Sequence, residues 1–155
     1  MKKAIIIVAG GTGSRMQSDI PKQFMLLKGK PLIFHTIEKF HAALPSCKII
    51  VVLPSSQMSY WEEIKQQHSF SIALETTAGG KSRFESVKNG MQLIHEECVV
   101  GVHDAVRPLI SIENIQLLFK EAEMKGNAVQ FVVQILLRIS LTQMFIRIKY
   151  LIISR

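Results

Sequence analysis

The stretch IIIVAGGTGSRM at residues 5–16 decides the fold of this chain. Four β-branched residues lead into three glycines within four positions, a pattern that predicts a buried parallel strand entering a tight loop. Without Cβ atoms, the glycines let the backbone approach a ligand closely, and successive N–H groups can then bind phosphate oxygens. Arg15 and Lys22 place two cations within reach of this loop. We therefore predict a phosphate site, against the alternative of a glycine turn that only joins a strand to a helix.

Two common glycine-rich motifs do not fit the sequence. The dinucleotide fingerprint G-x-G-x-x-G needs a last glycine where Arg15 or Met16 stands. A Walker loop ending in the Gly-Lys-Ser of residues 80–82 needs its first glycine at position 75, which is Glu75. The loop at residues 10–13 therefore belongs to neither group.

Strand-like and helix-like patterns alternate along the chain, as in a doubly wound α/β sheet. The predicted strands are 3–9, 49–53, 71–75 and 98–103, and the predicted helices are 31–40, 55–67, 81–95 and 111–125. Pro31 is expected in the first turn of its helix, and Ser55 or Ser56 is expected to cap the next one. Ser111 is expected to cap the last helix, which Gly126 ends. Ligands of such sheets bind outside the carboxyl ends of the strands, where the glycine loop lies.

Length and composition predict one small cytoplasmic domain. The chain has 155 residues, of which 48% are hydrophobic and 20% charged, as in ordinary globular proteins. Cys47 and Cys98 form no C-x-x-C pair, so we expect neither a disulfide nor a zinc site. The apolar run after Lys3 is too short for a signal peptide, and we interpret it as the first strand.

The net charge of +7 does not indicate nucleic-acid binding. Up to residue 125, fifteen Lys and Arg stand against twelve Asp and Glu, and the other four cations follow residue 137. No compact basic run carries interleaved aromatic residues, which nucleic-acid-binding surfaces use. An anionic small-molecule substrate accounts for the mild excess.

Three motifs resemble the 2-C-methyl-D-erythritol 4-phosphate cytidylyltransferases of the non-mevalonate isoprenoid pathway. They are AGGTGSRM at 9–16 with PKQ at 21–23, GGKSRFESV at 79–87 and HDAVRP at 103–108. The resemblance covers residue 1 to about residue 129. The ribitol-5-phosphate cytidylyltransferases share the first motif and a similar third one, and the Ser-Val pair at 86–87 favours the former family.

The resemblance implies an α/β fold with a doubly wound, mostly parallel sheet of the nucleotide-diphospho-sugar transferase (Rossmann-like) type, incomplete at its C-terminal end. It implies Mg²⁺-dependent transfer of CMP from CTP to 2-C-methyl-D-erythritol 4-phosphate, which gives 4-diphosphocytidyl-2-C-methyl-D-erythritol and pyrophosphate. The alternatives are ribitol 5-phosphate as the acceptor, and an incomplete domain that binds nucleotide without turnover. The family is homodimeric, but its dimerisation arm is not recognisable in this sequence.

The same resemblance assigns roles to individual residues. Arg15 and Lys22 would be catalytic and stabilise the charge at the α-phosphate, Asp104 would bind Mg²⁺, and Arg107 would bind the phosphate of the acceptor. The triphosphate would be bound by Ala9, Gly10, Gly11, Thr12 and Gly13. Cytosine would be bound by Gly80, Lys81 and Ser86. From the residues alone, surface cations, a glycine turn and a helix cap remain alternatives. His103 has no second His at metal-binding spacing, which favours a core or supporting role.

The sequence changes character near residue 129. Residues 1–128 are expected to form the N-terminal part of a CTP-binding nucleotidyltransferase domain, and residues 129–155 an atypical apolar and basic tail. From Gln130 on, the chain has no Gly, Pro, Asp, Asn or Glu, a composition that a shifted reading frame would explain. The alternatives are a basic amphipathic helix on a membrane or partner, and strands. Central arginines, at about 2.5–3.5 kcal/mol each, argue against a transmembrane helix.

Overall fold

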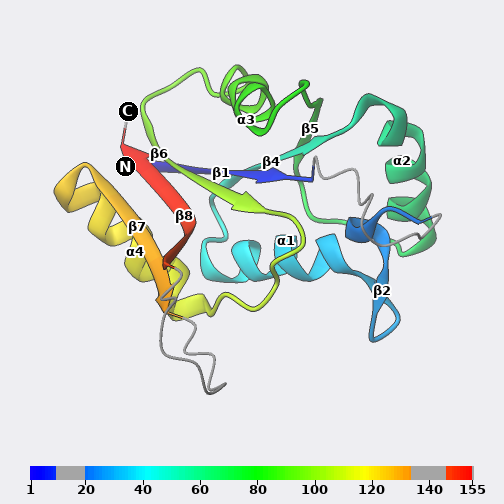
Figure 1. Cartoon of the computed structure of the whole chain (residues 1–155), viewed down its shortest axis with the longest axis horizontal. Coiled ribbons are helices and arrows are strands. Elements are labelled where there is room, and N and C mark those ends of the chain that lie inside the picture. The colour runs from blue at the N-terminus through cyan, green and yellow to red at the C-terminus, as the bar shows by residue number, and fades with distance from the viewer. Residues whose placement is uncertain (10–19, 134–145, 155) are drawn as a thin grey trace.

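The computed structural model describes residues 1–9, 20–133 and 146–154, which form a six-stranded sheet with helices packed on it and a separate two-stranded sheet (Figure 1). The strands are β1 (Lys2–Val8), β2 (Leu26–Leu27), β3 (Lys30–Pro31), β4 (Lys48–Leu53), β5 (Glu75–Ala78), β6 (Cys98–Asp104), β7 (Asn127–Val133) and β8 (Ile146–Ser154). The α-helices are α1 (Leu32–Ala43), α2 (Met58–Gln67), α3 (Arg83–Met91) and α4 (Ile112–Lys125). Two short 3₁₀ helices, η1 (Lys22–Phe24) and η2 (Ser55–Gln57), complete the set.

The large sheet has the strand order β5-β4-β1-β6-β8-β7. β1 lies between β4 and β6 and is parallel to both, and β4 is parallel to β5. β8 is antiparallel to both of its neighbours, β6 and β7. The predicted mostly parallel α/β sheet is therefore confirmed, and its parallel strands end at one common edge.

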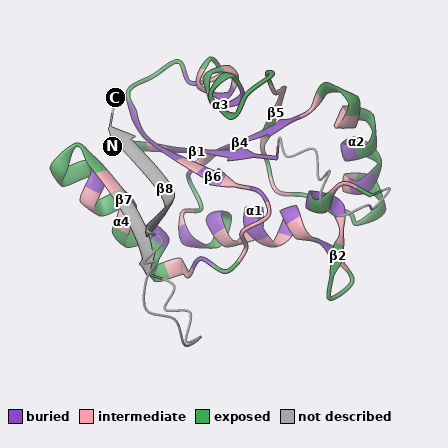
Figure 2. Cartoon of the chain, viewed as in Figure 1, coloured by how far each residue is buried: buried purple, intermediate pink, exposed green. Residues whose placement is uncertain are grey.

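Helices cover both faces of this sheet, as a doubly wound fold requires. Ile5 and Ile7 of β1 belong to one core cluster, together with buried residues of α1, α2 and α4. The alternate residue Ile6 belongs to a second cluster, against which Val87 and Met91 of α3 pack. Because successive side chains of a strand point to opposite faces, one apolar strand supplies two cores. Figure 2 shows these central strands as buried.

The last helix forms as its sequence predicts. The Ser111 hydroxyl accepts a hydrogen bond from the Asn114 backbone N–H at 3.1 Å, which satisfies one of the free amide groups of the first turn. Gly126 follows the helix with φ 83°, the left-handed conformation that glycine adopts at low cost. The predicted strand at 98–103 is also confirmed, one residue longer, as β6.

Several predicted element boundaries and caps are wrong. The strand expected at 71–75 is β5, which begins at Glu75 because its register sets residues 75–78 beside residues 50–53 of β4. Neither Ser55 nor Ser56 caps α2, since both lie in η2 and Gln57 is the capping residue, without a side-chain hydrogen bond. Pro31 precedes α1 as its cap instead of lying in its first turn, and α1 extends to residue 43.

The helix expected over 81–95 is shorter, because α3 spans only 83–91. Beyond Met91, the amides of Leu93 and Ile94 bond the carbonyls of Gly90 and Met91, three residues back. This tighter turn brings Ile94 into the second core cluster, where it is 9% exposed. The chain then enters β6.

The described part of the C-terminal region consists of strands. β7 covers residues 127–133 and β8 covers residues 146–154. The alternative prediction of an amphipathic helix is therefore wrong for residues 130–133. Residues 134–145 lie outside the described part of the chain. A shifted reading frame and the division at residue 129 stay predictions. Among the described residues, no helix has the length and apolarity needed to cross a membrane.

Candidate functional site

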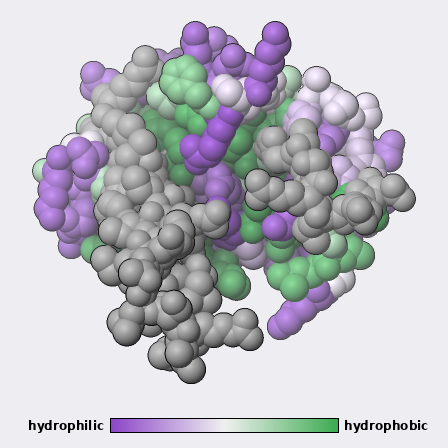
Figure 3. Space-filling view, in the orientation of Figure 1, coloured by the Kyte–Doolittle hydropathy of each residue, from purple (hydrophilic) through white to green (hydrophobic). Residues whose placement is uncertain are grey.

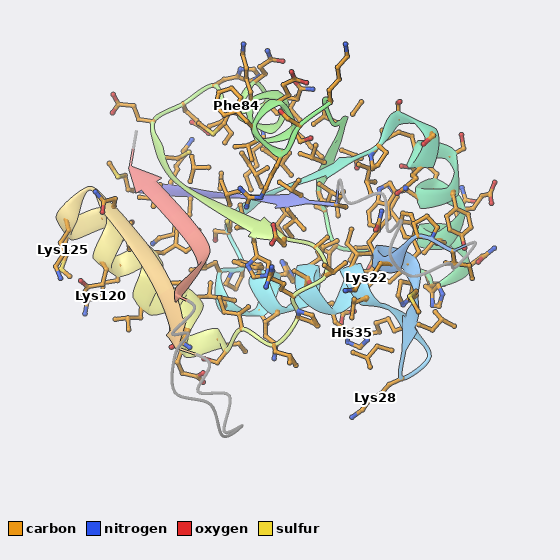
Figure 4. All side chains as sticks on the ribbon, in the orientation of Figure 1. Lys22, Lys28, His35, Phe84, Lys120 and Lys125 are labelled. Atoms are coloured by element: carbon orange, nitrogen blue, oxygen red, sulfur yellow. The ribbon has the colours of Figure 1, made fainter. Side chains whose placement is uncertain are left out.

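A cleft of about 360 Å³ lies at the carboxyl edge of the parallel strands. Four segments line it: the end of β1 with Ala9, η1 with Lys22 and Gln23, the turn and first residues of α3, and Asp104 at the end of β6. Figure 4 labels Lys22 on the side of the molecule toward which the arrows of β1 and β4 point. Segments distant in the sequence therefore meet at the position where α/β sheets bind ligands.

Backbone hydrogen bonds fix the segments where they leave the sheet. The Ala9 amide donates to the Val52 carbonyl at 2.8 Å, and the Ala105 amide donates to the Val8 carbonyl at 2.9 Å. The Gly79 amide donates to the Leu53 carbonyl at 2.7 Å. Each strand is thereby extended by about one residue, so the cleft begins on rigid backbone, which holds a binding geometry better than a free loop.

Gln23 also lines the cleft, and the sequence predicts no role for it. Its side chain is 2% exposed, and its amide Nε2 donates to the Ala9 carbonyl at 3.0 Å and to Gln57 Oε1 at 2.5 Å. Phe24, the next residue, packs in the core against the ring of Trp61 at 6.3 Å between centroids. The neighbouring Lys22 therefore stands on an anchored turn, and it forms no salt bridge with a described residue.

The N-terminus of α3 forms a second wall of the cleft. Ser82 caps the helix and accepts from the Glu85 amide at 3.1 Å, while the Glu85 carboxylate accepts from the Lys81 amide at 2.6 Å. Lys81, Ser82 and Arg83 line the cleft, so the positive end of the helix dipole lies beside it, which favours an anionic ligand.

Gly80 and Ser86 shape the turn before α3. The Ser86 hydroxyl accepts from the Gly80 amide at 3.1 Å and donates to the Ser82 carbonyl at 2.9 Å. A Cβ at position 80 would lie 2.3 Å from Glu85 Cβ, so the turn requires glycine. Ser86 is 2% exposed, and the part it plays in this structure is to hold the turn that lines the cleft.

Asp104 carries the carboxylate of the site and contacts two arginines. Its Oδ2 accepts from Arg107 Nε at 2.8 Å, and its Oδ1 contacts Arg83 Nη2 at 3.3 Å and Nε at 3.4 Å. The sequence assigned no role to Arg83, because its partner lies 21 residues away. The described residues hold no group of three or more metal-ligating side chains. One carboxylate in a cleft that also holds Lys22 and Lys81 suits Mg²⁺ only together with an anionic ligand, since Mg²⁺ keeps several waters and takes phosphate oxygens as ligands.

His103 supports the turn that carries Arg107. It is 1% exposed, its Nε2 bonds the Arg107 carbonyl at 2.9 Å, and its ring packs edge-on against Phe40 at 4.8 Å between centroids. Burial lowers the pKa of His103 to about 4, which keeps the imidazole neutral near pH 7. This placement agrees with a supporting role and not with metal binding.

The structure brings most of the described candidate residues together. Six of them line the cleft: Ala9, Lys22, Gly80, Lys81, Ser86 and Asp104. Arg107 is not among the residues that line the cleft, but it contacts Asp104, which is. The remaining candidates, Gly10, Gly11, Thr12, Gly13 and Arg15, lie outside the described residues. The fold and the cleft together define an α/β protein of the Rossmann-like kind, with a cleft lined by cationic residues and one carboxylate at the carboxyl edge of its sheet.

Comparisons with known proteins identify the family. The family model for 2-C-methyl-D-erythritol 4-phosphate cytidylyltransferase matches residues 3–144. This chain belongs to that family. The family match continues beyond residue 129, where the resemblance of the motifs was expected to end.

Curated relatives give the same result. The 2-C-methyl-D-erythritol 4-phosphate cytidylyltransferase of Bacteroides thetaiotaomicron is 46% identical over 123 residues, which are 79% of this chain and 56% of that protein. The corresponding protein of Azobacteroides pseudotrichonymphae is 49% identical over 122 residues, 79% of this chain and 55% of that protein. The chain thus spans about half the length of the curated relatives it matches.

Solved structures share the fold. The 2-C-methyl-D-erythritol 4-phosphate cytidylyltransferase of Francisella tularensis matches 100% of this chain and 73% of its own, with a TM-score of 0.68 and 28% identity. The bifunctional IspDF of Campylobacter jejuni matches 99% of this chain and 41% of its own, with a TM-score of 0.75 and 23% identity. The second likeness shows the fold alone.

Proposed function

We propose that this chain provides the CTP site of a cytidylyltransferase that transfers CMP to 2-C-methyl-D-erythritol 4-phosphate and releases pyrophosphate. The observation that carries the proposal is the convergence of Lys22, the N-terminus of α3 and Asp104 on one cleft. Family membership and the printed names of the relatives support the choice of substrates. Mg²⁺ is the proposed cofactor, and the cytoplasm is the proposed compartment.

The reaction needs positioning and charge neutralisation. An oxygen of the acceptor phosphate attacks the α-phosphorus of CTP in line with the departing pyrophosphate, and negative charge accumulates around that phosphorus. Lys22 and the helix N-terminus would offset part of this charge from fixed positions, at no reorganisation cost during the reaction. When bound at Asp104, Mg²⁺ would neutralise triphosphate oxygens as a Lewis acid. In the proposed mechanism Arg15 acts beside Lys22 on the α-phosphate.

Base and acceptor recognition are the finer parts of the proposal. The turn at residues 80–86 would present backbone groups to cytosine, held in shape by Ser86 and Glu85. Arg107 would bind the acceptor phosphate, since a planar guanidinium matches two phosphate oxygens. Its present contact with Asp104 keeps it next to the metal side of the cleft.

A pyrophosphate-release assay tests this function. The chain is incubated with CTP, Mg²⁺ and 2-C-methyl-D-erythritol 4-phosphate, with ribitol 5-phosphate replacing the acceptor in parallel and ATP or GTP replacing CTP. Release that needs CTP and the methylerythritol acceptor, and that Lys22→Ala abolishes, supports the proposal. Release only with ribitol 5-phosphate favours the alternative acceptor. CTP binding without release leaves a nucleotide-binding domain, and indifference among the nucleotides contradicts cytosine recognition.

A further inference from the structure

The two arginines on Asp104 hold its two carboxylate oxygens with unequal contacts. Arg107 approaches Oδ2 with a 2.8 Å hydrogen bond from Nε. Arg83 approaches Oδ1 with two long contacts of 3.3 and 3.4 Å. Charge-assisted hydrogen bonds of nitrogen to carboxylate are shortest and strongest near 2.7–2.9 Å. Arg83 is therefore the weaker of the two partners.

The surroundings of the two arginines also hold Arg83 less firmly than Arg107. The Arg107 backbone is tied at both ends, because its amide bonds the Asp104 carbonyl at 3.2 Å and its carbonyl bonds His103. Arg83 lies at the start of α3, and its side chain is 59% exposed against 34% for Arg107. The next residue, Phe84, is 77% exposed and is labelled over α3 in Figure 4. Figure 3, in the same orientation, shows apolar surface at the top of the molecule. The side chain of Arg83 can therefore leave Asp104 without disturbing the core.

A divalent cation at Asp104 would compete with Arg83 for the same oxygen. A cation bound at Oδ1 would stand where the guanidinium of Arg83 now lies, and the two positive charges would repel each other. Arg83 also lines the cleft, beside Lys81 and the helix N-terminus, where an entering triphosphate would offer new acceptors. A guanidinium binds phosphate oxygens through paired N–H groups. A triphosphate in the cleft would thus offer Arg83 a second partner besides Asp104.

We propose that Arg83 is a displaceable counter-ion of Asp104. It holds Oδ1 while the cleft is empty, and it moves to the triphosphate when a divalent cation takes that oxygen. The inference rests on the proposed function for the identity of the nucleotide, but not for the competition at Asp104. Its consequence is cooperative binding: each of the two ligands raises the affinity for the other by the same factor.

Binding of Mn²⁺ to the nucleotide-free chain, followed by the EPR signal of free Mn²⁺, tests the competition directly. Removing a partly exposed ion pair frees Asp104, so Arg83→Ala should bind Mn²⁺ about three- to tenfold more tightly than the unmodified chain. Lys88→Ala removes an exposed cation from the same helix that forms no salt bridge with a described residue, and its affinity should change by less than about twofold. Adding Asp104→Asn to Arg83→Ala should abolish the gain.

A second titration with CTP separates this inference from the proposed function. In the unmodified chain CTP should tighten Mn²⁺ binding, and in Arg83→Ala the factor should be smaller, because the metal site is already open. Equal Mn²⁺ affinity of the nucleotide-free unmodified chain and Arg83→Ala overturns the inference, as does a gain that survives Asp104→Asn. If no variant binds CTP, the proposed function fails, while the nucleotide-free titration still decides whether Arg83 competes with metal. Circular dichroism confirms the fold of each variant, and Arg83→Gln replaces any alanine variant that unfolds.

Discussion

The two edges of the same sheet carry cavities that differ in whether their lysines are already paired with carboxylates. The larger cavity, about 1020 Å³, lies at the amino edge, where β1, β4 and β6 begin. Its lysines are already paired, Lys2 with Glu96, Lys3 with Glu123 and Lys48 with Glu75. The carboxyl-edge cleft is about 360 Å³, and its Lys22 and Lys81 form no salt bridge with a described residue.

This difference shows that cavity size does not locate the site. An anionic ligand needs cations whose charge is not already neutralised, and the carboxyl edge offers Lys22 and Lys81 beside the N-terminus of α3. At the amino edge an anion would first have to break an existing ion pair. We therefore propose that the ligand binds in the smaller cavity, and the predictions that follow test the contrast between the two edges.

The largest expected effect is the low reactivity of Cys47 in the amino-edge cavity. Burial, and to a lesser extent the nearby Cys98, raises the pKa of the Cys47 thiol from 9.0 to about 12. The thiolate is the reactive form, so at pH 8 alkylation of the folded protein by iodoacetamide should be slower than that of the unfolded chain by about 10²–10³. Mass spectrometry in a Cys98→Ala background follows Cys47 alone.

The same shift predicts a loss of stability at high pH. A thiol whose pKa is higher in the folded state favours folding fully below its unfolded pKa of about 9, and the contribution is lost as the pH rises toward 12. Cys47→Ala should flatten this part of the stability profile. Native Cys47 that reacts as fast as the unfolded chain would show that the amino edge is open and chemically active.

The second effect compares lysines from the two edges. Lys22→Ala removes a charge-assisted contact with phosphate, worth about 1.5–3 kcal/mol, so CTP should bind about 10- to 100-fold more weakly. Lys48→Ala removes a cation of the amino edge and should change CTP affinity by less than about twofold. Isothermal titration calorimetry measures both. Equal losses would mean that only net charge matters, and the contrast between the edges would not hold.

The smallest effect compares two helix caps. Ser82→Ala and Ser111→Ala each remove a hydroxyl that accepts a backbone N–H at 3.1 Å, and each should lower the free energy of unfolding by about 0.5–2 kcal/mol in urea denaturation. Only Ser82 borders the cleft, so only its loss should also weaken CTP binding. A similar loss of CTP affinity in Ser111→Ala would indicate a global effect of stability instead of a local one.

The sequence predicted the features that depend on local pattern. Lys22 and Asp104 were assigned because they stand in motifs, and Asp104 directly ends an apolar strand that forms as expected. The contacts of Gln23 and Arg83 could not be predicted, because their partners lie 34 and 21 positions away in the sequence. The position of β5 was missed for the same reason, since pairing with β4 and not the residues of 71–75 alone decides where that strand begins.

Hydrogen exchange of backbone amides with and without CTP and Mg²⁺ tests the central claim most directly, because one experiment reports on both edges. We expect CTP to slow exchange at residues 80–86 and 104–106 of the carboxyl edge, and to leave residues 1–4 and 45–48 of the amino edge unchanged. Protection confined to the amino edge, or no protection at residues 80–86 at saturating CTP, would contradict a nucleotide site at the carboxyl edge.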